Sequence, residues 1–205
     1  MERFLITQSL LSAWNYAHDC HTSCADDAYK DFLDTLNRVR KEPSEAMQNG
    51  IRFENAVYRV ANGCPLDEYV WESGIKAVAD VIRGAAIQVK LSRNLRVDGR
   101  DFVVYGIADA VKAGTIYDVK YSINNFASAE LPGKYLNSPQ HPAYLYALPE
   151  ARDFVYLVSD GEDLYTERYD RKNTRPIEEI VKEFVDFLGV SGLMGIFEDK
   201  WRAYG

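Results

Sequence analysis

Two aspartates and a lysine stand close together in the middle of the chain, at Asp109, Asp118 and Lys120. Apolar and polar residues alternate on either side of Ala113-Gly114, which is typical of two strands joined by a two-residue hairpin loop. Counting outward from that loop places Asp109 opposite Asp118. The flanking pairs in this register are Lys112 with Thr115 and Val111 with Ile116. Opposed side chains share one face of a sheet about 5 Å apart and Lys120 lies on the same face, so we expect two carboxylates and one ammonium to converge here.

The chemistry of such a hairpin follows from its charges. Two aspartates on a largely apolar face repel each other, and burial increases the repulsion. A divalent cation removes this conflict, and Mg²⁺ is a hard ion that prefers carboxylates while it retains bound waters. Lys120 can then position or deprotonate a metal-bound water, or stabilise charge that develops on a phosphate. The hairpin therefore predicts metal-dependent hydrolysis of phosphodiesters.

A simpler alternative is that the two aspartates are exposed residues beside a turn and that the lysine is their salt-bridge partner. Three residues elsewhere favour the metal site. Gln140 and Tyr144 are four apart, so they share one face of a helix predicted after the strands and can hold a phosphate, a strand or a site residue. Glu54 flanks the apolar stripe of an earlier helix, from whose edge it can project toward the sheet. Taken alone, each of the three reads as an ordinary polar surface residue.

The elements that must position these residues can be read from the spacing of apolar side chains. Residues 1–83 have helical spacing, with capping residues at Thr7 or Ser9 and at Ser44. Residues 84–148 change to a period of two and end in a helix, and residues 149–205 contain further strands and helices. The strands predicted for the sheet are Ala85–Leu91, Leu95–Val97, Phe102–Lys112, Thr115–Ser122, Phe154–Ser159 and Leu164–Tyr169, with a turn at Arg93-Asn94. This order predicts a single α/β (α+β) domain over residues 1–205, in which helices flank a central sheet.

Charge is unevenly distributed along the chain. The net charge is −7, which is unusual for a protein that binds nucleic acid, but residues 84–141 carry 7 basic and 5 acidic side chains. Two of those acids are the candidate metal ligands, so this segment is the part of the chain suited to a polyanion. Its best candidates for phosphate contacts are Arg93, Arg96, Arg100 and Lys134; the alternative is that they form a solvated surface.

Composition restricts the class of protein. No apolar run approaches the roughly eighteen residues that a membrane span requires, and we expect no membrane association. Three cysteines, an odd number, argue against a disulfide framework and for a reducing cytosol, so we expect a cytoplasmic protein.

Four short motifs, taken in order, resemble those of the PD-(D/E)XK nuclease superfamily, specifically its RecB-like and phage-type exonuclease branch. The resemblance covers about residues 5–148. Its motifs are Gly50-Ile-Arg-Phe-Glu54 in an early helix, Gly106-Ile-Ala-Asp109, Asp118-Val-Lys120 and Gln140-His-Pro-Ala-Tyr144. The departures are an alanine before Asp109 where proline is common, and Glu54 where many RecB-like enzymes have a histidine.

The resemblance implies both a fold and roles for the residues. The fold would be restriction-endonuclease-like, with a mixed sheet of four or five strands flanked by helices. Asp109 and Asp118 would bind Mg²⁺ or Mn²⁺, with the Val119 carbonyl as a further ligand, and Lys120 would orient the attacking water. Glu54 would be a ligand or hold a metal-bound water. The pair Gln140 and Tyr144 would organise the site and contact DNA.

These expectations lead to a functional hypothesis. We expect a phage-type or prophage-type DNA exonuclease that acts in recombination or repair, alone, as a homo-oligomer, or beside a recombination or single-strand-binding partner. Exonuclease rather than endonuclease activity is implied by the resemblance alone. The alternatives are a non-catalytic module that keeps the fold to bind nucleic acid or protein, and a metal-dependent hydrolase of another phosphoester.

Overall fold

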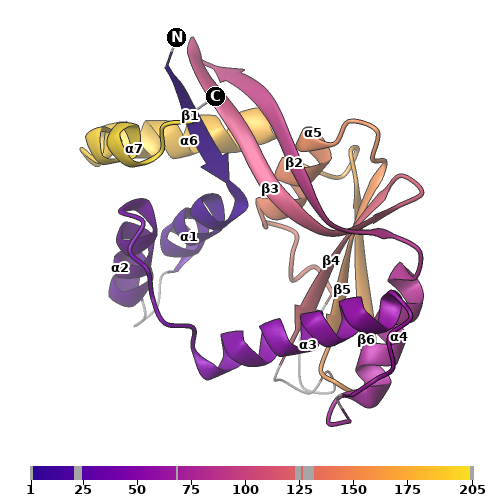
Figure 1. The fold of residues 1–205 in the computed structure, drawn as a ribbon. Coiled ribbons are helices and arrows are strands. Elements are labelled where there is room, and N and C mark those ends of the chain that lie inside the picture. The colour runs from indigo at the N-terminus through magenta and orange to yellow at the C-terminus, as the bar shows by residue number, and fades with distance from the viewer. Residues whose placement is uncertain (1, 21–24, 68, 123–125, 127–131, 204–205) are drawn as a thin grey trace.

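Helices and strands follow one another closely in the computed structural model, which describes residues 2–20, 25–67, 69–122, 126 and 132–203 (Figure 1). The strands are β1 (Arg3–Thr7), β2 (Ala86–Val97), β3 (Arg100–Lys112), β4 (Thr115–Tyr121), β5 (Asp153–Ser159) and β6 (Leu164–Asp170). The helices are α1 (Gln8–Asp19), α2 (Ala25–Leu36), α3 (Glu45–Ala61), α4 (Glu72–Ile82), α5 (Gln140–Ala147), α6 (Ile177–Val190) and α7 (Met194–Lys200). None of these helices is long and apolar enough to span a membrane.

The strands form one mixed six-stranded sheet in the order β1-β3-β4-β5-β6, with β2 also paired to β3. The pairs β1–β3 and β4–β5 are parallel, and the other pairs are antiparallel. Helices flank this sheet, so the predicted fold class is confirmed. The sheet has six strands rather than the four or five expected.

Two strand predictions were wrong. The first 83 residues are not all helical, because Arg3–Thr7 forms β1 in parallel with residues 101–105 of β3. The turn predicted at Arg93-Asn94 does not exist, and β2 runs unbroken through it. Arg93 continues the strand because it pairs with Val104 and its guanidinium stacks on the ring of Tyr146, 4.7 Å from the ring centre.

The helix starts were predicted correctly where a side chain caps them. The Thr7 hydroxyl accepts a hydrogen bond from the Leu10 N–H, and Ser44 accepts one from the Met47 N–H. These bonds satisfy amide groups that the first helical turn leaves unpaired. The cap at Thr7 also fixes the point at which β1 becomes α1.

The sheet divides at strand β3, where β1 and β4 pair with different parts of the same edge; we call this place the fork. Strand β2 pairs along one edge of β3, so β1 and β4 share the other edge. The pairing with β1 ends at Tyr105 and the pairing with β4 begins at Ala110. Residues 106–109 therefore lie between the two partners, and the last of these residues is Asp109.

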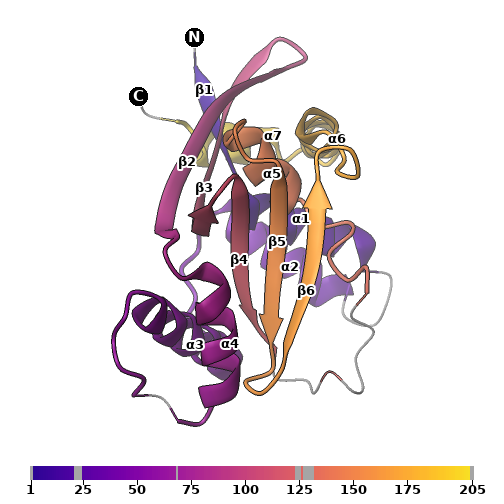
Figure 2. The same cartoon turned by 90° about the vertical axis from the view of Figure 1, so that its right-hand side faces the viewer.

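Two separate hydrophobic cores pack against the sheet on either side of the fork. Helices α3 and α4 cover one face beside β4 and β5 (Figure 2), and the core there includes Phe53, Val57, Ile75, Val119 and Leu157. The larger core lies with α1, α5, α6 and α7 and includes Phe102, Phe154, Tyr156, Phe184 and Phe197. The fork thus lies where two packing layers meet, and α3 and α5 approach it from different sides.

Candidate active site

Asp118 on β4 has two polar partners at the fork, Gln140 and Lys120. Its side chain is buried, with 4% of the residue exposed. The Gln140 amide donates a short hydrogen bond to Oδ1, and the Lys120 ammonium lies 2.8 Å from Oδ2. Within the described residues Oδ2 makes no hydrogen bond of normal geometry, although it is buried. The carboxylate is therefore fixed from the α5 side and retains an oxygen whose main neighbour is a cation.

Asp109 on β3 lies directly beyond the last rung of the β3–β4 ladder. The predicted pairs of Lys112 with Thr115 and of Val111 with Ile116 are confirmed. The ladder ends at Ala110–Tyr117, so the predicted pair of Asp109 with Asp118 is not part of it. Asp109 Oδ2 accepts a hydrogen bond of 2.8 Å from the Val119 N–H. A side chain of one strand therefore bonds the backbone of the other, and the two aspartates lie beside each other at the fork.

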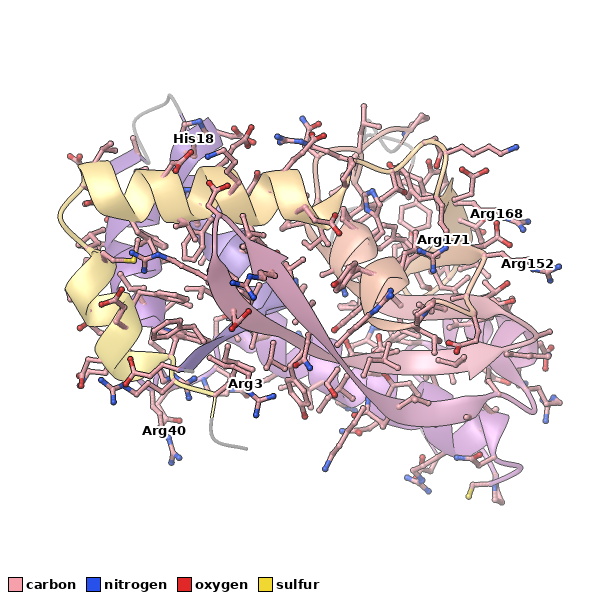
Figure 3. The ribbon with its side chains drawn as sticks, turned by 90° about the horizontal axis from the view of Figure 1, so that it is seen from above. Arg3, His18, Arg40, Arg152, Arg168 and Arg171 are labelled. Atoms are coloured by element: carbon pink, nitrogen blue, oxygen red, sulfur yellow. The ribbon has the colours of Figure 1, made fainter. Side chains whose placement is uncertain are left out.

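Helix α5 connects both strands of the fork. While Gln140 binds Asp118, the Tyr144 hydroxyl donates to the Ile107 carbonyl at 3.1 Å, in the segment of β3 that neither β1 nor β4 pairs. The far end of α5 is fixed by Arg171, whose guanidinium donates to carbonyls at that end (Figure 3). Gln140 and Tyr144 therefore connect helix α5 to both strands, and their spacing of four residues places them on one face of the helix.

Gly106 makes this arrangement sterically possible, because a Cβ on it would collide with the Tyr144 ring. We expect Gly106→Ala to lower the free energy of unfolding by about 2 kcal/mol, since the ring must move or the strand must shift. Urea titration will measure this. Gly50→Ala is the control, because its added Cβ meets nothing within 4 Å and helix α3 gains propensity. Equal effects of the two changes would contradict the steric argument.

His141, the neighbour of Gln140, is buried and uncharged. Its Nδ1 lies 3.1 Å from the Tyr156 hydroxyl, its ring stacks on Tyr169, and burial lowers its pKa to about 4. Because this folded-state pKa lies below the ordinary value near 6.5, the neutral ring contributes stability that is complete above about pH 6.5. That stability is lost as the pH falls toward 4, by about 2 kcal/mol at pH 5.

The measurement compares unfolding free energies of wild type and His141→Gln at pH 7.5 and pH 5. The raised pKa values of Glu54 and Asp109 act in the opposite direction and are common to both proteins. The wild type should therefore lose about 2 kcal/mol more than the variant on acidification. Equal losses would show that His141 titrates normally in the folded protein.

Glu54 reaches the same site from α3, which passes beside β4 (Figure 1). Burial, together with the negative charges of Asp109 and Asp118, raises the pKa of Glu54 to about 7 against the lowering effect of Lys120. Burial and the charge of Asp118 likewise raise the pKa of Asp109 to about 6, against the lowering effect of the Val119 N–H. Three carboxyl groups from three elements therefore interact through space, and their charges destabilise one another.

Lys120 is the cation that these carboxylates face. Burial disfavours its charged form, but the adjacent charges of Asp118 and Asp109 outweigh burial and hold its pKa above the ordinary value. Its side chain is partly exposed along its length, while its ammonium contacts the buried Asp118 carboxylate. It is thus a charged donor held within the site.

The donor set suits a hard divalent cation. Two aspartates lie side by side, the buried Oδ2 of Asp118 has the Lys120 ammonium as its neighbour, and burial together with repulsion raises the pKa of Asp109 and of Glu54. In the part of the chain that the structure describes, no three His, Cys, Asp or Glu side chains converge into a ready-made metal cage. Asp109 and Asp118 with water ligands fit Mg²⁺, which commonly binds one or two carboxylates and keeps several waters. A third carboxylate, Glu54, lies within electrostatic range.

Three of the four basic residues predicted to contact phosphates are not at this site. Arg93, Arg96 and Arg100 lie on the β2–β3 hairpin, toward the end away from Asp109. Each is engaged locally: Arg93 donates to the Tyr146 carbonyl, Arg96 lies 3.8 Å from Asp101, and Arg100 pairs with Glu198. Lys134 lies over the ring of Tyr135, which interacts with Lys120, so Lys134 is the one of the four beside the site.

Two residues that the sequence reading did not select also face Asp109. Tyr58 follows Glu54 by one helical turn, a spacing that places both side chains on one face of α3 and that could have identified it. Gln88 lies on β2 opposite Asp109. Placing Gln88 opposite Asp109 requires the register of β2 with β3. The turn wrongly predicted at Arg93-Asn94 hid that register.

Comparison with known proteins identifies the fold. No protein-family model and no curated protein sequence matches the chain. Among solved structures, SSO0001 superposes with a TM-score of 0.55 at 14% identity over 93% of this chain and 78% of that chain. An alkaline exonuclease (LHK-Exo) from Laribacter hongkongensis gives a TM-score of 0.50 at 14% identity over 94% and 89%, and its complex with dAMP gives 0.51. The chain therefore shares its fold with an alkaline exonuclease.

Proposed function

We propose that this protein is a Mg²⁺- or Mn²⁺-dependent deoxyribonuclease of the PD-(D/E)XK superfamily, in its RecB-like and phage-exonuclease branch. The observation that carries the proposal is the environment of Asp118. One buried carboxylate is bound at once by Gln140 and Lys120, and Asp109 lies beside it on the adjacent strand. A structural salt bridge does not require a second, mutually repelling carboxylate. A divalent cation bound between two carboxylates accounts for it, because the cation removes their repulsion.

Each residue has a distinct task in this proposal. Asp109 and Asp118 hold the metal, with Glu54 and the Val119 carbonyl as further donors. The bound ion supplies a Lewis acid and lowers the pKa of a water ligand. Lys120 orients the attacking water and offsets charge that develops on the phosphate. Gln140 and Tyr144 keep Asp118 and β3 at the separation that the chemistry needs.

The substrate and the cellular role are also proposals. The fold shared with an alkaline exonuclease that was crystallised with dAMP supports a DNA substrate and cleavage from an end. We place the enzyme in phage or prophage recombination or repair, in the cytoplasm, as one domain spanning residues 1–205. A homo-oligomer or a recombination partner fits this role. Lys134 is the nearest candidate for a contact with the DNA backbone.

The test is cleavage of end-labelled linear and circular DNA, single- and double-stranded, with Mg²⁺, Mn²⁺ or EDTA. We expect linear DNA to be degraded with either metal and to survive in EDTA, and circles to be spared. Cleavage of circles would make the enzyme an endonuclease. Well-folded protein that cleaves no DNA would contradict the proposal and favour a nucleic-acid- or protein-binding module. Hydrolysis of a nucleotide monoester alone would indicate a different phosphoesterase.

A further inference from the structure

Tyr58 on α3 has a buried hydroxyl with an unusual environment. The residue is 9% exposed, and its Oη makes no hydrogen bond of normal geometry to any described residue. A tyrosine hydroxyl carries its proton at neutral pH, so Tyr58 can donate a hydrogen bond, and Asp109 and Glu54 are the carboxylates near it. Two of the four buried side-chain atoms that lack a hydrogen bond in the described residues, Tyr58 Oη and Asp118 Oδ2, thus belong to one site. Buried polar groups are rarely left unpaired without a functional reason.

Gln88 on β2 approaches the same hydroxyl from the sheet. Ile87 pairs with Ala110 and Val89 with Ala108, so Gln88 lies opposite Asp109 where the ladder is interrupted. Its backbone has φ +55° in the interior of a strand, a conformation that non-glycine residues rarely adopt. Such strained residues persist where their surroundings require them, and they cluster at functional sites.

The strain at Gln88 coincides with a change in β3. Residues two apart on a regular strand share one face. Ala108 nevertheless packs in the larger core, whereas Ala110 packs in the core under α3 and α4. The two faces of strand β3 therefore change over at Asp109, whose carboxylate interacts with Tyr58 on α3.

We propose that Gln88 and Tyr58 form a positioning relay for Asp109, in which the Gln88 amide donates to Tyr58 Oη and the Tyr58 hydroxyl donates to the Asp109 carboxylate. The inference rests on the proposed function, since it concerns Asp109 as a metal ligand. The Val119 N–H already fixes Oδ2 from β4, and the relay fixes the carboxylate from α3 and β2. Such hydrogen bonds are often loose in a free enzyme and tighten in the loaded site. Partners of this kind orient a ligand rather than bind the metal.

The test uses Tyr58→Phe and Gln88→Gly, with Mn²⁺ binding measured by titration calorimetry and Tm measured on the same samples. Phenylalanine keeps the ring and removes the donor. Glycine removes an exposed side chain and adopts φ +55° without strain. We expect each variant to bind Mn²⁺ about tenfold more weakly. The double variant should bind no more weakly than either single variant, because the relay is one unit.

Comparing Tm with metal affinity distinguishes a positioning role of Tyr58 and Gln88 from a role in stability alone. Tyr58→Phe should leave Tm unchanged, and Gln88→Gly should raise it, while metal affinity falls in both. In cleavage assays both should lower kcat and raise the Mg²⁺ concentration for half-maximal rate, without changing KM for DNA. Tyr29→Phe, an exposed tyrosine on α2 that packs against Phe32, is the matched control and should behave as wild type.

The outcomes are distinct. Wild-type affinity in Tyr58→Phe and Gln88→Gly overturns the relay and leaves the nuclease proposal standing. Additive losses in the double variant overturn the link between the two residues. If the wild type itself binds no Mn²⁺ and cleaves no DNA, the proposed function fails and the relay fails with it.

Discussion

Replacing Asp118 by asparagine is expected to reduce DNA cleavage about a thousandfold, equivalent to about 4 kcal/mol of transition-state stabilisation. Asparagine keeps the shape and can still accept the hydrogen bond from Gln140, but it cannot neutralise a divalent cation. Mn²⁺ binding should disappear with the activity. Calorimetric titration and a single-turnover cleavage assay are the two measurements.

The fold should survive this change. Lys120 loses its closest partner, but the charge of Asp109 still acts on it, and the repulsion of Asp118 on Asp109 is removed. The matched control is Asp153→Asn on the neighbouring strand β5. Asp153 is also buried, but it binds the guanidinium of Arg168 (labelled in Figure 3), away from the fork. Asp153→Asn should lower Tm and leave cleavage by the folded protein intact. Metal binding retained in Asp118→Asn would remove Asp118 from the ligand set.

Replacing Lys120 by alanine is expected to separate metal binding from catalysis. The ammonium lies 2.8 Å from Asp118 Oδ2, so it competes for the oxygen that a cation would use. Lys120→Ala should therefore bind Mn²⁺ at least as tightly as the wild type. It should nevertheless cleave DNA about a hundredfold to a thousandfold more slowly, because the donor that orients water and offsets phosphate charge is gone.

The control for this variant is Lys112→Ala on β3. Lys112 donates to the carbonyls of Val81 and Arg83 at the end of α4, so its loss should affect stability and not chemistry. Cleavage by Lys120→Ala at the wild-type rate would show that the lysine is only a salt-bridge partner. That is the simpler alternative which the sequence alone leaves open.

The hairpin could be predicted from sequence because its register depends on two residues. Ala113 and Gly114 both have positive φ, 51° and 79°, as a tight two-residue turn requires, and the pairs out to Ala110–Tyr117 are then placed by counting. The side-chain bond from Asp109 to the Val119 N–H could not be predicted. It forms where the β3–β4 pairing ends at Ala110–Tyr117, and the sequence does not show where that pairing ends.

The missed elements have physical reasons. Strand β1 has five residues, too few for its alternation to be distinguished from the start of the helix that follows it, and its partner lies far along the sequence. Arg93-Asn94 has the polarity of a turn, but the strand continues through it because Tyr146 supports Arg93. The spacing of Gln140 and Tyr144 predicted that they share one face of a helix. It could not predict that Gln140 contacts Asp118, because that contact depends on how α5 packs against the sheet.

The fork at β3 also sets the order in which the site can assemble during folding. The bonds Asp109–Val119, Gln140–Asp118 and Tyr144–Ile107 join residues only 10, 22 and 37 positions apart, so the β3–β4–α5 unit closes small loops. Docking of β1 onto β3 closes a loop of roughly 100 residues, which costs more chain entropy and is slower. We therefore expect the hairpin that carries the two aspartates and Lys120 to form before β1 docks onto β3.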